Sequence, residues 1–173
     1  MSRFFIRMTR IVRHLGSAIF GSAERGLPPA VRTRIQQHIA ASESCHTGQI
    51  RIYAESSLPL SYLSRDASPR ERAITLFGKL RVWDTECNNG VLIYLLTAEH
   101  AIEIIADRGL NPHVSHNRWQ EMISHMSTPL RAGHWEDGLM RALDDVSALL
   151  ELHFPSVPGS MHHNELPDAP IVR

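Results

Sequence analysis

Apolar residues follow one another without interruption from Val91 to Leu96, which is the length of a strand. Such a run predicts a central strand buried on both faces of a sheet. The next apolar stretch, Ala101–Ala106, is rich in β-forming residues but contains Glu103, so one of its faces is expected to reach solvent or the sheet edge. If Thr97 ends the first strand and lies opposite Ala101, only Ala98, Glu99 and His100 separate the two strands. We therefore predict an antiparallel hairpin in which Val91 lies opposite Asp107.

A strand and a helix are predicted before this hairpin. Gln49–Glu55 alternates apolar and polar residues, which predicts a strand with one exposed face. Ser68–Glu71 combines an N-cap serine, a proline at the first helical position and a capping-box glutamate, which predicts the start of a helix. The helix is expected to bury Ile74 among other apolar residues. Strand, helix and strand in this order predict a right-handed parallel crossover, and hence a mixed sheet of three strands covered by helices.

Further helices are predicted on both sides of this unit. Their apolar residues repeat at helical spacing in three stripes: Val31, Ile35 and Ile39; Trp119, Met122, Ile123, Met126 and Leu130; Leu139, Leu143, Val146 and Leu150. Gly21–Gly26 is expected to be a linker, and Ser56–Ala67 a loop. The remainder after Pro155 is expected to be a poorly structured or surface-lying tail. The predicted organisation is therefore an N-terminal segment (1–27), a domain (28–155) and a tail (156–173).

The N-terminal segment predicts a basic amphipathic helix. Arg3, Arg7, Arg10 and Arg13 recur at spacings of three and four, so they line one helical face. A helix of this kind either lies on an anionic membrane surface or docks on its own domain, and docking is the more common outcome. Residues 1–20 are therefore a candidate contact with a membrane surface or a membrane protein.

The composition limits the functional classes. The 173 residues include 18 basic and 18 acidic side chains, so the overall charge gives no reason to expect nucleic acid as the partner. Cys45 and Cys87 lack metal-ligand spacing and are expected to be free thiols. No stretch is long and apolar enough to span a bilayer, and arginines interrupt every candidate signal-peptide core. We expect a cytoplasmic protein, with peripheral membrane contact as the alternative.

Oxygen-bearing side chains converge at one end of the predicted sheet. The hairpin brings Asp107 to the loop that precedes the first of its strands, and the parallel crossover brings the end of the first helix to the same place. Carboxylates and side-chain amides suit a hard cation, so a calcium or magnesium site is predicted. The candidate metal ligands are Glu43, His46, Asp84, Glu86, Asn88, Asn89 and Asp107. The spacing of an EF-hand is absent.

Structural roles compete with this interpretation. Asp84 could brace its loop, Asn88-Asn89-Gly90 could be turn chemistry, and His46 could complement a helix end. Two histidine pairs, His113 with His116 and His162 with His163, are weaker candidates for zinc because loop histidines are more often solvated. A further site is allowed for near Glu55 and Thr97, since open α/β sheets usually bind ligands at the carboxyl ends of their parallel strands.

Six stretches of the sequence share the pattern of a known family: Glu43-x-x-His46-x-Gly48-Gln49-Ile50, Arg70–Ala73, Leu80–Tyr94, Ile104–Gly109, Phe154-Pro155 and Asn164–Asp168. On these residues the chain resembles the TPM-domain family, and the last three stretches are similar to its soluble bacterial branch. The resemblance extends over roughly Pro28–Pro155, and Asn88–Leu92 is its most specific part. It implies a three-layer α/β/α sandwich with a Rossmann-like appearance and a mixed central sheet.

The resemblance also implies functions. Relatives include thylakoid-lumen proteins with weak acid phosphatase activity and roles in photosystem repair, some of which bind calcium, and an auxiliary subunit of a receptor. Many relatives carry a transmembrane helix, and many have Gly-Asp-Tyr where this chain has Gly133-His134-Trp135. An acid that would contribute to a site is therefore missing here.

Two functional hypotheses follow. In the first, a divalent cation orients a phosphoester and activates water, Asp84 and Asp107 serve catalysis, and Arg108 or Arg81 neutralises phosphate charge. This would be a weak, metal-dependent phosphatase. In the second, the chain is a non-catalytic binding module that supports the assembly or repair of membrane proteins.

Overall fold

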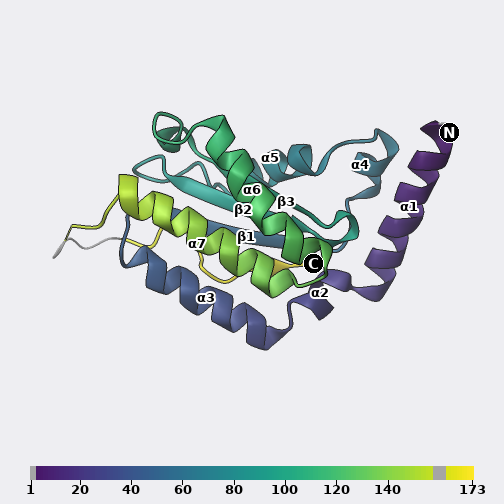
Figure 1. Ribbon diagram of the computed structural model, residues 1–173, viewed down its shortest axis with the longest axis horizontal. Coiled ribbons are helices and arrows are strands. Elements are labelled where there is room, and N and C mark those ends of the chain that lie inside the picture. The colour runs from purple at the N-terminus through teal and green to yellow at the C-terminus, as the bar shows by residue number, and fades with distance from the viewer. Residues whose placement is uncertain (1–2, 158–162) are drawn as a thin grey trace.

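The computed structural model describes residues 3–157 and 163–173, and it describes no side chain for residues 3–6 or His116. Figure 1 shows helices on both faces of a central sheet. The longer helices are α1 (Arg3–Phe20), α3 (Pro29–Glu43), α5 (Pro69–Lys79), α6 (His116–Arg131) and α7 (Trp135–His153). The strands are β1 (Gln49–Glu55), β2 (Gly90–Leu96), β3 (Ala101–Ala106) and β4 (Ile171–Val172). Short helices α2 (Ser22–Gly26) and α4 (Leu60–Ser64), with the 3₁₀ turns η1 (Thr97–Glu99) and η2 (Arg108–Leu110), complete the described elements.

The sheet has the strand order β3-β2-β1-β4. The predicted parallel pairing of β1 with β2 is confirmed, and so is the antiparallel pairing of β2 with β3. The predicted hairpin register is wrong by one residue, because Val91 lies opposite Ala106 and not Asp107. Thr97 leaves the strand to begin η1, and His100 has a left-handed φ of 50° that reverses the chain. The connection therefore takes four residues where the sequence suggested three.

Both faces of the sheet are covered, which confirms the α/β/α sandwich. One hydrophobic core lies between the sheet and α3, α6 and α7 and includes Ile50, Ile52 and Ile93. The other lies beneath α5 and includes Tyr53 and Tyr94. The prediction that β1 has an exposed face is wrong, because each of its seven residues is buried. None of the described helices is both long and apolar enough to cross a membrane.

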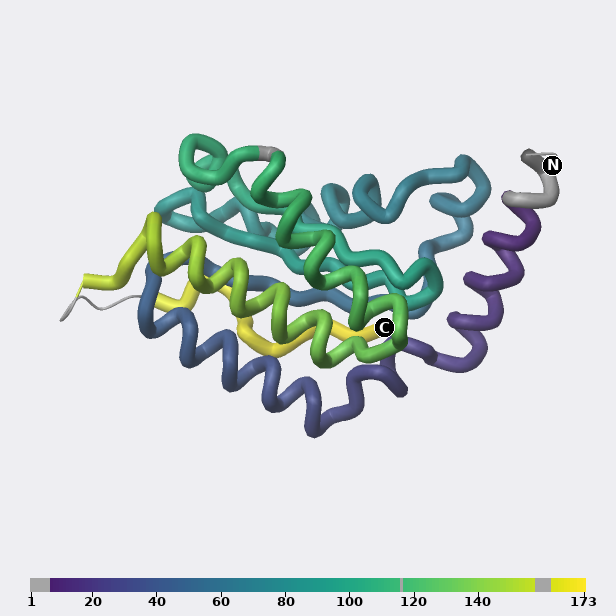
Figure 2. Tube along the Cα trace, viewed as in Figure 1, coloured from purple at the N-terminus to yellow at the C-terminus, as the bar shows by residue number. Residues whose placement is uncertain are grey.

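The C-terminal residues were predicted to be a tail, but they contribute the fourth strand. Ile171 pairs with Tyr53, so β4 runs parallel to β1 at the sheet edge. In Figure 2 this yellow segment runs beside the blue β1. The side-chain Oε1 of Gln49 accepts hydrogen bonds from Glu165 N at 2.8 Å and Leu166 N at 2.9 Å. These contacts cover the β1 face that the alternation had marked as exposed.

Three local predictions also differ from the structure. The segment Gly21–Gly26, predicted as a linker, contains α2, and the predicted loop Ser56–Ala67 contains α4. Helix α5 begins as predicted, since Ser68 Oγ accepts a hydrogen bond from Glu71 N at 3.2 Å. Ile74 is nevertheless 53% exposed. Arg72, Ala73 and Leu76 form the buried face of α5 instead, because Arg72 is drawn inward by a partner on β1.

Candidate functional site

The end of β3 and the start of β2 meet, and this part of the predicted cluster does converge. Asp107 N donates to Gly90 O at 2.9 Å, and Gly109 N donates to Asn88 O at 2.9 Å. The Arg108 Nε–H donates to Asn88 Oδ1 at 2.9 Å. Gly109 has to be glycine here, because a Cβ would lie 2.5 Å from Asn88 O. The loop before β2 and the loop after β3 are therefore joined by hydrogen bonds.

The two acids of the loop before β2 do not turn into this junction. The Asp84 side chain is 54% exposed and lies 3.8 Å from the Arg81 guanidinium. Glu86 is exposed, and its backbone N–H donates to the Glu165 carboxylate at 3.0 Å. Within residues 3–157 and 163–173, no three His, Cys, Asp or Glu side chains gather closely enough to hold one ion. The seven predicted metal ligands are therefore not assembled into one carboxylate-rich site.

Glu43 is the last residue of α3 and His46 follows three residues later, and both are turned into the protein. Glu43 Oε1 accepts a hydrogen bond from Ile50 N at 2.8 Å, which fixes the start of the strand. Burial raises the pKa of Glu43 from 4.5 to about 7, although this hydrogen bond opposes the shift. His46 is 1% exposed, and burial lowers its pKa. Its Nδ1–H donates to Gly48 O at 3.1 Å.

Unpartnered buried atoms are concentrated on the predicted site residues. His46 Nε2, Asn89 Oδ1 and Asp107 Oδ2 are buried and have no hydrogen-bond partner in the described part of the chain. Asp107 Oδ1 accepts from Arg108 N at 2.7 Å, and Asn89 Nδ2 donates to Thr47 Oγ1 at 3.1 Å. Buried polar atoms normally have partners, so the two oxygens are the atoms best suited to receive a cation or a water molecule at this end.

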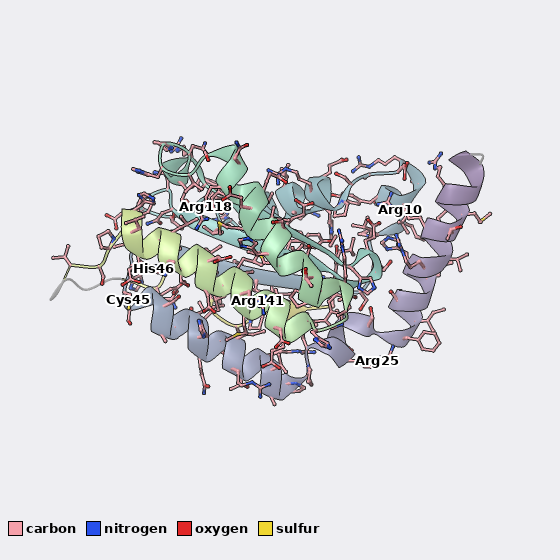
Figure 3. All side chains as sticks on the ribbon, viewed as in Figure 1. Arg10, Arg25, Cys45, His46, Arg118 and Arg141 are labelled. Carbon is pink, nitrogen blue, oxygen red and sulfur yellow. The ribbon has the colours of Figure 1, made fainter. Side chains whose placement is uncertain are left out.

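Of the weaker zinc candidates, the structure describes the side chains of His113 and His163. The His113 ring stacks on the ring of His153, with 4.6 Å between centroids, and contacts Phe154 edge-on. The side chains of His116 and His162 lie outside the described residues. His163 is exposed. Figure 3 shows that His46 is near this end of the molecule, while Arg10, on α1, lies at the other end.

A buried charge network lies at the carboxyl ends of the parallel strands. The Arg72 guanidinium donates from Nε and Nη2 to the two Glu55 oxygens, each at 2.9 Å. Tyr94 OH donates to the same carboxylate at 2.6 Å. Burial and the Glu55 charge raise the pKa of Tyr94 far above its usual value. The sequence pointed to Glu55 but not to Arg72, although Arg72 lies four residues before Leu76 on the buried side of α5.

A cavity of about 320 Å³ adjoins this network. Its lining includes Glu55, Ser56 and Ser57 from the end of β1, together with Glu24 and Arg173. Thr97, the other residue expected near this site, has its hydroxyl 2.5 Å from Ser22 Oγ. The Glu55 carboxylate is already paired with the Arg72 guanidinium. It therefore does not give the cavity an unpaired negative charge.

A groove of about 240 Å³ follows the outer edge of β3, between α5 and α6. Ile104, Ile105 and Ala106 line it from the strand, and Arg70, Trp119 and Gln120 line it from the helices. No motif in the sequence indicated this groove. The only signal was Glu103, which indicated that one side of the second hairpin strand is accessible.

The fold and these surfaces define a class of protein: an α/β/α sandwich with an open mixed sheet, whose loop end is fixed by hydrogen bonds and whose hairpin strand forms an accessible edge. The model of the TPM domain family matches residues 23–149. The chain therefore belongs to the TPM domain family. Its fold is similar to the NMR structure of BA42 protein from the psychrophilic bacterium Bizionia argentinensis, with a TM-score of 0.70 and 24% identity over 82% of this chain and 92% of that one. No curated protein matches the sequence significantly.

Proposed function

We propose that this TPM-domain protein is a non-catalytic binding module that holds an extended segment of a membrane-protein partner along β3. The observation that carries the proposal is the 240 Å³ groove whose floor is Ile104–Ala106. Alternate residues of an edge strand direct their N–H and C=O groups away from the paired strand. Because Asp107 N bonds to Gly90 O, the residues that direct these groups outward are Ile102, Ile104 and Ala106.

The groove has the chemistry of a peptide site. An extended segment that adds to a sheet edge gains affinity from main-chain hydrogen bonds and specificity from side-chain pockets. Trp119 supplies an aromatic wall, and tryptophan and arginine are enriched at protein interfaces. The Arg70 side chain is 54% exposed and is 3.2 Å from Glu103. The partner segment is therefore expected to be apolar with an acidic side chain that reaches Arg70.

We assign no group a role in hydrolysis, because the three predicted catalytic residues make contacts that stabilise loops. Asp107 caps η2 through Arg108 N. Arg108 is bonded to Asn88, and Asp84 lies at the surface beside Arg81. These interactions stabilise loops and leave no pair of acids facing a common substrate. The choice of a membrane protein as partner comes from the resemblance to relatives that assist membrane complexes.

A photo-crosslinking residue in the groove tests the proposal. We expect the probe at Gln120 to crosslink a membrane protein in cells, while the same probe at the exposed Arg118, just outside the groove, serves as the matched control. Trp119→Ala should reduce the crosslink at least fivefold. Equal crosslinking at positions 118 and 120 would contradict groove binding. Hydrolysis of p-nitrophenyl phosphate that disappears in both Asp84→Asn and Asp107→Asn would contradict the non-catalytic role.

A divalent cation at the loop end is the second candidate function. The observation that favours it is the pair of buried oxygens without partners, Asn89 Oδ1 and Asp107 Oδ2. Calcium or magnesium would take Asp107 Oδ2 together with backbone carbonyls or water. Calorimetric titration with each ion should give heat of binding for the wild type and for Asp84→Asn, but none for Asp107→Asn. Absence of binding by the wild type would reject this candidate.

A further inference from the structure

Helix α1 is bound to the domain through its polar side. Arg10 donates to Glu99 from Nε and to Asp66 from Nη1, each at 2.7 Å. His14 is fully buried, with Nε2 2.7 Å from Glu99 Oε1 and Nδ1 accepting from Leu58 N at 3.1 Å. Figure 3 shows Arg10 between α1 and the domain. The contacts of this side are specific and charged, which is the reverse of an ordinary amphipathic helix.

The apolar side of α1 consequently points away from the domain. Its exposed fractions are 47% for Met8, 61% for Val12, 48% for Leu15 and 76% for Ile19. Scattered exposed apolar residues are normal, but a continuous stripe along one helix marks an interaction surface. We call these four residues the α1 stripe. In Figure 1, α1 stands at one end of the molecule, apart from the helices that cover the sheet.

The spacing of the α1 stripe is that of a coiled-coil seam. The intervals of four, three and four residues place Met8 and Leu15 at d positions, and Val12 and Ile19 at a positions. Phe5 continues the same spacing in the sequence. β-Branched residues at a together with leucine at d favour two parallel helices. The pattern thus fits a second helix of the same kind.

The charges also favour a second copy over a lipid surface. A helix that lies on an anionic membrane needs basic residues beside its apolar face. Of the arginines in residues 7–20, Arg10 is bound to Glu99 and Asp66, Arg7 donates to Ser64 O at 2.7 Å, and Arg13 is exposed. The positions that flank the seam, at e and g of the heptad, carry no charge: Thr9, Ile11, Gly16 and Ala18. The 18 basic and 18 acidic residues of the chain also cancel, so two copies approach without net repulsion.

We propose that the α1 stripe pairs with the α1 stripe of a second copy of this chain, forming a parallel two-stranded coiled coil that makes the protein a dimer. The arrangement has two-fold symmetry, so each stripe is buried by its own equivalent. A hollow of about 200 Å³ lined by Met8, Ile11 and Leu63 lies beside the seam and receives side chains from the partner helix. The β3 groove remains open, so this inference is independent of the proposed function.

Mass measurement by light scattering on the full chain tests the dimer. The wild type should have twice the 19.5 kDa of one chain. Leu15→Glu should weaken self-association at least 100-fold and give a monomer that retains the circular dichroism spectrum of the wild type. The matched control is Leu152→Glu, because Leu152 is 71% exposed on α7, away from the seam. This control should remain a dimer.

Disulfide crosslinking tests the parallel orientation independently of the charged variant. With Cys45 and Cys87 replaced by serine, Ile19→Cys should give a covalent dimer under mild oxidation, because equivalent a positions face each other only in a parallel pair. Arg13→Cys, on the same helix but off the stripe, should not. A monomeric wild type would overturn the proposal. So would a monomer that binds phosphatidylglycerol vesicles through the stripe, because the occupant would then be lipid.

Discussion

At the scale of single residues, polar side chains act mainly as internal braces. Glu43 fixes the start of β1, Asp107 caps η2, and Arg72 neutralises Glu55 beneath Tyr94. Each residue type was compatible with a catalytic or metal-binding role in the sequence. Their hydrogen bonds use part of this capacity, because a bonded carboxylate has fewer lone pairs available to a ligand.

The raised pKa of Glu43 predicts a pH dependence of stability. A carboxyl whose pKa is higher in the folded state binds more protons there, so its contribution to stability is lost as pH rises from 4.5 to about 7. The loss is at most about 3 kcal/mol. Glu43→Gln keeps an acceptor for Ile50 N and removes the charge.

Glu43→Gln should therefore melt at a higher temperature than the wild type at pH 8 and at nearly the same temperature at pH 4. Thermal unfolding followed by circular dichroism at both pH values provides the measurement. The exposed Glu121→Gln is the control and should show no such difference between the two pH values. An equal effect of Glu43→Gln at pH 4 and pH 8 would show that its carboxyl is not the titrating group.

The buried pair of Glu55 and Arg72 predicts strong coupling in stability. Their side chains are 6% and 11% exposed. Arg72→Met leaves the carboxylate without its partner and should lower the free energy of unfolding by about 3–5 kcal/mol in urea titrations. The double variant Glu55→Gln, Arg72→Met should recover at least about 1 kcal/mol of this loss. Strictly additive effects of the two substitutions would argue against direct coupling.

At the scale of elements, the sheet is completed by a segment distant in sequence. Strand β4 pairs with β1 and protects an edge that would otherwise expose unpaired backbone groups. The alternation of Gln49–Glu55 predicted an exposed face because the pattern depends only on side-chain polarity. It cannot show that the C-terminal residues pack over this face. Arg51, for example, donates hydrogen bonds to the backbone carbonyls of Pro167 and Ala169.

Leu166 tests whether the C-terminal segment contributes to stability. It is 7% exposed in the core beneath α5. Leu166→Ala should lower the free energy of unfolding by about 2 kcal/mol and raise hydrogen exchange in β1, since β4 would be held less firmly. Val157→Ala, at a site 66% exposed, is the control and should change little. Equal stability of the two variants would show that the segment merely rests on the surface.

At the scale of the whole molecule, the two ends of the sheet differ in structure. The loop end is closed by hydrogen bonds among Asn88, Arg108 and Gly109. The opposite end bears α1, whose apolar stripe points outward. We propose the α1 stripe for self-association and a second surface, the β3 groove, for a partner. The formal net charge of zero is compatible with both contacts.

A dimer makes thermal stability depend on concentration. Unfolding then separates two chains, so mass action should raise Tm by about 2 °C for each tenfold increase in protein concentration. Differential scanning calorimetry over a wide concentration range gives this dependence. Leu15→Glu should abolish it. A wild-type Tm that is constant with concentration would be inconsistent with a dimer that persists to the unfolding transition.

The elements with local signals could be predicted from the sequence. The apolar run of β2, the N-cap of α5 and the parallel crossover follow from spacing and capping, and the sequence also identified the family. The meeting of Asp107 with the loop before β2 followed too, because a short hairpin brings its ends together even when its register is off by one residue.

Tertiary structure alone decided the rest. Residues distant in the sequence set the direction of the Asp84 side chain, the ion-pair partner of Arg72 and the face of α1 that contacts the domain. The amphipathic pattern of α1 was visible from the start, but its orientation was set by the ion pair of Arg10 with Glu99. The sequence of an amphipathic helix shows its apolar and its polar face, but not which of the two contacts the domain. The charges on the surface of the domain select the face that binds.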